Sequence, residues 1–194
     1  MGVYYISTEL SHHGVKGMKW GVRKEQKYMA KSEKWARKEE KARTNFGKNR
    51  ASDKRIAYKY AAQQQHAINN SKGVKQKLRN TMGAEASELL SKAGAEQYAA
   101  RASRAKSDKK RARLERAAYN NASMARHYKN VSQHSNSTIR RAKYSATHMG
   151  KVPLKNIRNG KSTTYGREFA KAMAVSLAYT AAQTAASMYM EDKM

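Results

Sequence analysis

Two adjacent histidines, His12 and His13, open the stretch HHGVKGMKWGVRK, whose residue types are among the best suited to chemistry in this sequence. An imidazole can ligate a metal or transfer a proton near neutral pH. A zinc site needs three or four convergent ligands, however. The chain has no cysteine, and its other histidines are widely separated: His66, His127, His134 and His148. The spacing therefore predicts polar loop histidines, with no metal site and no cofactor.

The sequence also lacks the frame of a nucleophilic enzyme or of a nucleotide-binding loop. No G-x-S-x-G occurs, and most carboxylates stand beside Lys or Arg, as in KEEK and ARLER, which is typical of ion pairs on a helix surface. Gly14, Gly17 and Gly21 follow the spacing G-x-x-G-x-x-x-G, which is neither the dinucleotide fingerprint nor a P-loop. We therefore expect a protein that is not an enzyme.

The strongest signal is charge. The 194 residues include 41 Lys and Arg against 14 Asp and Glu, a formal net charge of +27. Such a charge opposes compaction by self-repulsion, so we expect a polyanionic partner: DNA, RNA, an anionic membrane or an acidic protein. Phosphate contacts would be salt-dependent and tolerant of sequence, with interleaved Tyr and Trp able to stack on bases. The predicted polyanion-binding residues are Arg101, Arg104, Lys106, Lys109, Lys110, Arg111, Arg113, Arg116, Arg140 and Arg141.

The glycine-rich stretch has a second interpretation, as a docking segment. Met18, Trp20 and Val22 would alternate along an extended chain, so that large apolar groups enter a groove while the lysines meet an acidic rim. The alternative is a local turn packed on the protein's own helices, with Trp20 in the core. The predicted docking residues are His12, His13, Gly14, Lys16, Gly17, Met18, Lys19, Trp20, Gly21 and Arg23.

The elements that must position these residues are mostly helices. Lys, Glu, Ala and Arg dominate the chain and favour helix, whereas only two Phe and two Trp are present and Ala buries little area. We predict a mainly α, elongated helical protein with a thin core, a short extended or strand-like N-terminal arm and a Gly-rich loop. The predicted divisions are the arm with its docking segment (1–23), a basic helical region (24–148), a linker (149–162) and an Ala/Met/Tyr-rich C-terminal helix (163–194).

Within the basic region, the pattern predicts a first helix from Lys24 that ends near Asn45–Gly47 and a second helix capped by Ser52 or Asp53. Further helices are expected over Val74 to about Met82, Ala95 to about Val131 and Thr138 to His148. In the last helix, residues 172–190 carry no charge and approach the length of a membrane span. Their Ala, Ser, Thr and Tyr content favours a packed helix, and we expect no membrane partner.

The segment HHGVKGMKWGVRK, His12 to Lys24, resembles a short signature that recurs in proteins encoded by tailed phages and prophages. In those proteins it lies near the ends of minor head proteins, head-morphogenesis proteins and small neighbours in virion gene blocks. The resemblance implies a virion or capsid-associated protein, located in the host cytoplasm before assembly. It also implies that the segment is an address read by a common partner such as the capsid shell. It carries over no catalytic residue.

Together these observations predict a phage virion structural protein, associated with the head or carried inside it. Its partners would be capsid or other virion proteins, DNA held by non-specific phosphate contacts, and further copies of itself. One alternative is a small phage-encoded factor that binds nucleic acid in the host or inhibits a host nucleic-acid enzyme. Another is a membrane-active ejected protein that uses the last helix.

Overall fold

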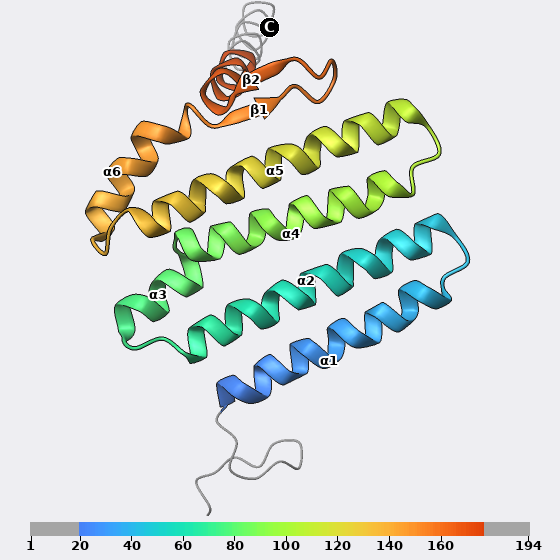
Figure 1. The fold of residues 1–194 in the computed structure, drawn as a ribbon, viewed down its shortest axis with the longest axis horizontal. Coiled ribbons are helices and arrows are strands. Elements are labelled where there is room, and N and C mark those ends of the chain that lie inside the picture. Colours follow the sequence, from blue (N-terminus) through green and yellow to red (C-terminus); the bar gives the residue numbers. More distant parts are fainter. Residues whose placement is uncertain (1–19, 177–194) are drawn as a thin grey trace, which may run out of the picture. The chain divides into compact units, whose positions relative to one another are not determined.

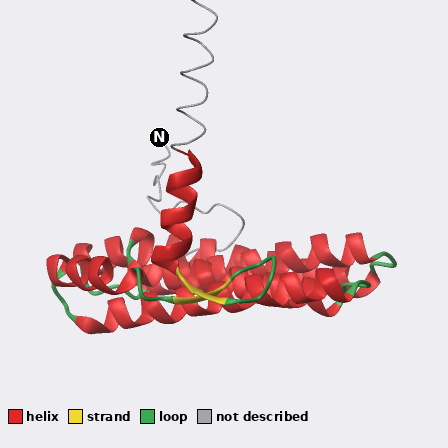
Figure 2. Cartoon of the chain, turned by 90° about the horizontal axis from the view of Figure 1, so that it is seen from above, coloured by secondary structure: helices red, strands yellow, loops and turns green. Residues whose placement is uncertain are grey.

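The computed structural model describes residues 20–176, and within this range the protein is mainly α-helical, as the sequence predicts (Figure 1). The chain forms two compact units, one up to Leu89 and one from Leu90, which we describe separately. In the described residues, one pair of short strands accompanies the helices (Figure 2). The described core is thin, as expected, because seven of its ten buried hydrophobic residues are alanines.

The first unit is built on a pair of antiparallel helices, α1 (Trp20–Lys41) and α2 (Asn45–Asn69). Thr44 caps α2, since its hydroxyl accepts a hydrogen bond from Gly47 N at 3.1 Å. The predicted caps of the second helix, Ser52 and Asp53, were therefore wrong. Ser52 is fully buried inside α2, one turn before the equally buried Ile56. The stretch expected to end the first helix instead begins the second, because a capping threonine precedes it.

Polar contacts attach α3 (Val74–Met82) to the end of α2. The buried Asn80 donates from Nδ2 to Ala67 O at 2.9 Å and to Ser71 Oγ at 3.0 Å. The bounds of α3 agree with the prediction. Its apolar side chains do not form a core: Val74, Leu78 and Met82 are all exposed.

A single long helix was predicted from Ala95 to about Val131, and the structure corrects this. The chain instead forms α4 (Ala84–Ser103), which begins in the first unit, and α5 (Asp108–His134). Ser107 in extended conformation starts α5, with Asp108 in the first turn, where a carboxylate is favoured by the helix dipole. In the second unit the helices approach closely: a Cβ on Gly94 would lie 2.6 Å from Asn121 Oδ1.

The corner between α5 and α6 (Thr138–Met149) is held by one arginine and by stacked rings. Arg141 donates to the carbonyls of Ser132 and Ser135 at the end of α5. The Tyr144 ring lies between His134 and His148, with centroid distances of 4.2 and 4.1 Å. Nearby, Nε2 of the buried His127 lies 3.2 Å from Ser145 Oγ.

A strand and a turn lie within the predicted linker 149–162. The strand is β1 (Pro153–Lys155), which pairs antiparallel with β2 (Ser162–Thr164) in the register Leu154 opposite Thr163. A helix follows from residue 165 to the end of the described range at 176, two residues later than predicted. The rest of the predicted C-terminal helix, including most of 172–190, lies outside the described residues, as does the predicted arm before residue 20.

The α5–α6 corner should weaken in acid. Burial, and secondarily the charge of His148, lower the pKa of His127 below its ordinary value of 6.5. A histidine whose pKa is lower in the folded protein binds its proton more readily when unfolded, so stability is full above 6.5 and falls as the pH drops below it. We expect the urea midpoint to decrease between about pH 7.5 and about pH 5. His127→Gln should reduce that decrease, and an equal pH dependence in His127→Gln and wild type would contradict this assignment.

Candidate polyanion-binding surface and docking segment

The predicted docking segment is only partly described, because its residues before Trp20 lie outside the described range. The remaining part is helical: Trp20, Gly21 and Arg23 form the first turn of α1. The expected extended alternation through Trp20 and Val22 is therefore wrong. Trp20 is 66% exposed, so it is not the core residue of the alternative interpretation either.

Gly21 allows the start of α1 to lie close to the end of α2. A Cβ at this position would lie 2.1 Å from Asn69 Oδ1, so no larger residue fits without a shift. Asn69 cannot shift freely, because its Oδ1 accepts from Gln65 Nε2 and its Nδ2 donates to Glu25 Oε2, both at 2.9 Å. The other carboxylate oxygen of Glu25 lies 2.9 Å from His66 Nδ1. This glycine of the segment thus permits local packing.

The predicted polyanion-binding residues divide into two groups. The first group is exposed and makes no ion pair with any described residue: Lys106, Lys109, Lys110, Arg113 and Arg140. Four of these lie in the loop before α5 or in its first two turns. Cations at a helix N-terminus oppose the helix dipole. A bound anion at this end of α5 would therefore be attracted by both the side chains and the backbone.

The second group is engaged within the protein. Arg116 Nη1 donates to Ile157 O and Arg158 O, both at 3.0 Å. Arg111 pairs with Asp108 at 3.3 Å. Arg141 holds the α5–α6 corner, and the half-buried Arg101 lies over the Tyr98 ring, 6.0 Å from its centroid. Arg104 is also half-buried. We therefore expect the exposed cations to make most of any phosphate contact, which stays a prediction.

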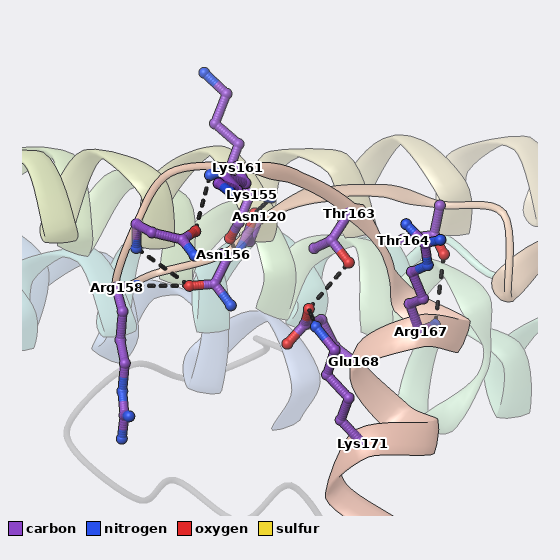
Figure 3. A network of polar contacts seen from close by, with 11 residues as sticks. Asn120, Lys155, Asn156, Arg158, Lys161, Thr163, Thr164, Arg167, Glu168 and Lys171 are labelled. Atoms are coloured by element: carbon purple, nitrogen blue, oxygen red, sulfur yellow. Dashed lines mark hydrogen bonds and ion pairs between the residues drawn. The ribbon is translucent and has the colours of Figure 1, made fainter.

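Sequence reasoning missed a further set of cations, on the turn that joins β1 to β2 (Figure 3). Asn120 of α5 fixes β1, because its Oδ1 accepts from Lys155 N at 2.7 Å and its Nδ2 donates to Lys155 O at 2.9 Å. Asn156 Oδ1 accepts from the backbone of Arg158 at 3.0 Å and shapes the turn. The adjacent Asn-Gly pair at 159–160 is a turn signal that could have revealed it. The exposed cations of this turn are Lys155, Arg158 and Lys161.

A carboxylate anchors the following helix to β2. Glu168 Oε1 accepts from Thr163 Oγ1 at 2.9 Å and lies 3.1 Å from Lys171 Nζ (Figure 3). These hydrogen bonds, from Lys171 first and then from Thr163, lower the pKa of Glu168. The helix presents exposed apolar side chains beyond this anchor: Phe169, Met173 and Val175.

Between residues 20 and 176, no three His, Asp or Glu side chains converge as metal ligands would. None of the helices in that range combines the length and the hydropathy that a membrane crossing requires.

Comparison with known proteins gives one match. Residues 5–27 match a family described as a family of unknown function, DUF7211. No curated protein and no solved structure matches the chain. The family match contains the whole His12–Lys24 segment and ends two turns into α1, so the similarity is confined to the start of the chain.

Gly21→Ala should destabilise the first unit by about 1–3 kcal/mol, the usual cost of overpacking. The reason is the clash with Asn69, since Ala alone favours helix. Thermal denaturation followed by circular dichroism measures the effect. Adding Asn69→Ala removes the clashing amide, so Gly21→Ala should cost much less in that background. Additive effects of the two substitutions would contradict the proposed contact.

Gly160→Ala should destabilise the second unit by about 1–3 kcal/mol. Gly160 has a φ of +75°, and a Cβ there would lie 2.8 Å from Arg116 Nη2. Gly150→Ala is the matched control, because that glycine has a helical φ of −59° and a Cβ added to it would meet no atom within 4 Å. The control should be neutral or slightly stabilising in chemical denaturation. Equal losses in the two variants would show that the turn does not depend on Gly160.

Proposed function

We propose that this protein is a structural component of a phage virion, associated with the head or carried within it. The observation that carries the proposal is the segment His12 to Lys24, which resembles the signature found in phage head and head-morphogenesis proteins. In this proposal the segment docks on a capsid partner. The helical remainder of the chain makes electrostatic contact with packaged DNA or with an acidic capsid surface.

The distribution of charge supports this mechanism. The protein has 27 more cations than anions, and its described core consists mostly of alanine, which contributes little hydrophobic stabilisation. Exposed cations on α5, on its preceding loop and on the β1–β2 turn belong to one compact unit. A dense polyanion such as packaged DNA would neutralise them and release its own counterions.

The helix over 165–176 supports a protein partner in addition. Phe169 and Met173, one helical turn apart, are 55% and 46% exposed on a helix whose base is fixed by Glu168. Large apolar groups exposed together on one helix mark interaction surfaces. Capsid protein or another copy of this chain would cover them in an assembled particle.

The second candidate function is a nucleic-acid-binding factor that acts in the host cell. The same exposed cations favour it, because they require a polyanion but not a capsid. Mass spectrometry of purified particles separates the two. Many copies per particle are expected for the structural role, and absence from particles would support the host factor instead.

Incorporation into particles tests the docking role of the N-terminal segment. Deleting residues 11–19 leaves every described residue in place, so the helices should persist while incorporation falls at least about tenfold, the effect of losing roughly 1.4 kcal/mol of binding. A variant with the same nine residues in scrambled order keeps the charge and composition. It should also fail to incorporate if the order of residues is recognised. Unchanged incorporation of the deletion variant would rule out a docking segment.

A further inference from the structure

Six lysines of α1 form a continuous stripe along one side of the helix. The lysine stripe consists of Lys24, Lys27, Lys31, Lys34, Lys38 and Lys41. Successive members are three or four residues apart in strict alternation. At about 100° of rotation and 1.5 Å of rise per residue, they fall within a sector of about 100° and extend for about 25 Å along the helix. The stripe is therefore a linear array of like charge.

Half of the stripe is held in place by aromatic rings. The ammonium groups of Lys24, Lys31 and Lys38, seven residues apart, lie over the rings of Tyr28, Tyr58 and Trp35 at 5.9, 5.1 and 4.5 Å from the centroids. Such contacts restrict side chains that otherwise lose much conformational entropy on binding. The other three, Lys27, Lys34 and Lys41, are exposed and form a parallel outer row.

Within the described range, no acidic residue of α1 forms an ion pair with a lysine of the stripe. Glu25 and Glu39 face α2, where Glu25 contacts Asn69 and Glu39 pairs with Arg55 at 2.8 Å. Glu33 and Glu40 each precede a stripe lysine by one residue and so lie about 100° around the helix from it. None of the six lysines makes an ion pair with any residue in the described range. Each successive pair therefore repels at i,i+3 or i,i+4 spacing, which destabilises an isolated helix.

The surface around the stripe favours phosphate over protein as the partner. Protein interfaces depend on buried aromatic or aliphatic anchors, whereas the rings beside the stripe, Tyr28, Trp35 and Tyr58, are half-buried and lie beneath lysine ammonium groups. The exposed Met29 lies on the opposite flank, in a groove whose lining includes Glu25 and Glu33. Beside the second half of the stripe runs an open trough of about 470 Å³, lined by Ala30, Glu33, Lys34, Arg37, Lys38 and Lys41. A backbone of regularly spaced phosphates matches this array of point charges.

We propose that the lysine stripe of α1 binds the phosphate backbone of duplex DNA. Its length of about 25 Å corresponds to roughly seven base pairs at 3.4 Å per step along each strand. Binding would not depend on base sequence, because the stripe holds no group suited to read base edges. This inference rests on the proposed function for the choice of DNA, and adds the surface and the mode of contact.

The test compares two triple variants of the full chain that lose the same charge. Lys27→Gln, Lys34→Gln and Lys41→Gln remove the outer row of the stripe. The control changes Lys72, Lys75 and Lys77 to Gln, which are exposed lysines of the same unit. Fluorescence anisotropy with a short DNA duplex gives the affinity between about 50 and 200 mM salt. Circular dichroism establishes that both variants keep their helices.

The stripe variant should bind at least about tenfold more weakly, and its slope of log affinity against log salt should shrink by about 2.7, at 0.9 per lost phosphate contact. The slope for the control variant should change by less than about 0.9, the value for one phosphate contact. Equal losses in both variants would overturn the inference, because binding would then follow total charge. If the stripe variant keeps its DNA affinity but binds polyglutamate more weakly, the inference is also overturned, and an acidic protein is favoured as the partner.

This outcome is separable from that of the proposed function. If the stripe variant binds DNA as tightly as the wild type while the wild-type chain is present in particles, only the proposed binding of DNA by the stripe is overturned. A chain that binds DNA through the stripe but is absent from particles would overturn only the virion role.

Discussion

Repulsion among lysines and arginines is the constraint on which the rest of this structure depends. The chain carries a net charge of +27, and the described core that must oppose this repulsion contains seven alanines, one isoleucine and two valines. Each buried alanine removes little apolar area from water. The helices must therefore be held together by something besides hydrophobic burial, and the cations must be arranged so that repulsion is spread over surfaces or relieved by a partner.

Specific polar contacts supply much of the missing cohesion. Asn69, Asn80 and Asn120 each connect two elements by hydrogen bonds of 2.7–2.9 Å. Asn69 bonds to Glu25 of α1, Asn80 to Ala67 of α2, and Asn120 twice to Lys155 of β1. Two arginines do the same at the ends of elements, since Arg141 closes the α5–α6 corner and Arg116 holds the turn beside α5. Hydrogen bonds of this kind contribute modestly but demand defined geometry. The close glycine contacts at 21 and 94 are a consequence of that geometry.

Cations in this protein thus have two tasks. Cations that donate hydrogen bonds to backbone carbonyls, such as Arg116 and Arg141, stabilise the fold, and these bonds partly satisfy their charge inside the chain. Those without ion pairs in the described range, on α1, at the start of α5 and on the β1–β2 turn, keep their full attraction for an external anion. The proposed virion role uses the second group, and the segment at the start of the chain would bring them to their partner.

The sequence by itself determined the helical class, the thin alanine core, the excess of cations and the position of α3, because composition and local propensity decide these. It could not locate the break at 104–107 or the cap at Thr44, since several polar residues compete locally and packing selects among them. Only the tertiary structure decided which cations are exposed. Arg113 and Arg116 are equivalent as charges, yet one is exposed to solvent and the other is bound to the turn, because β1 and its turn pack against α5 at Asn120.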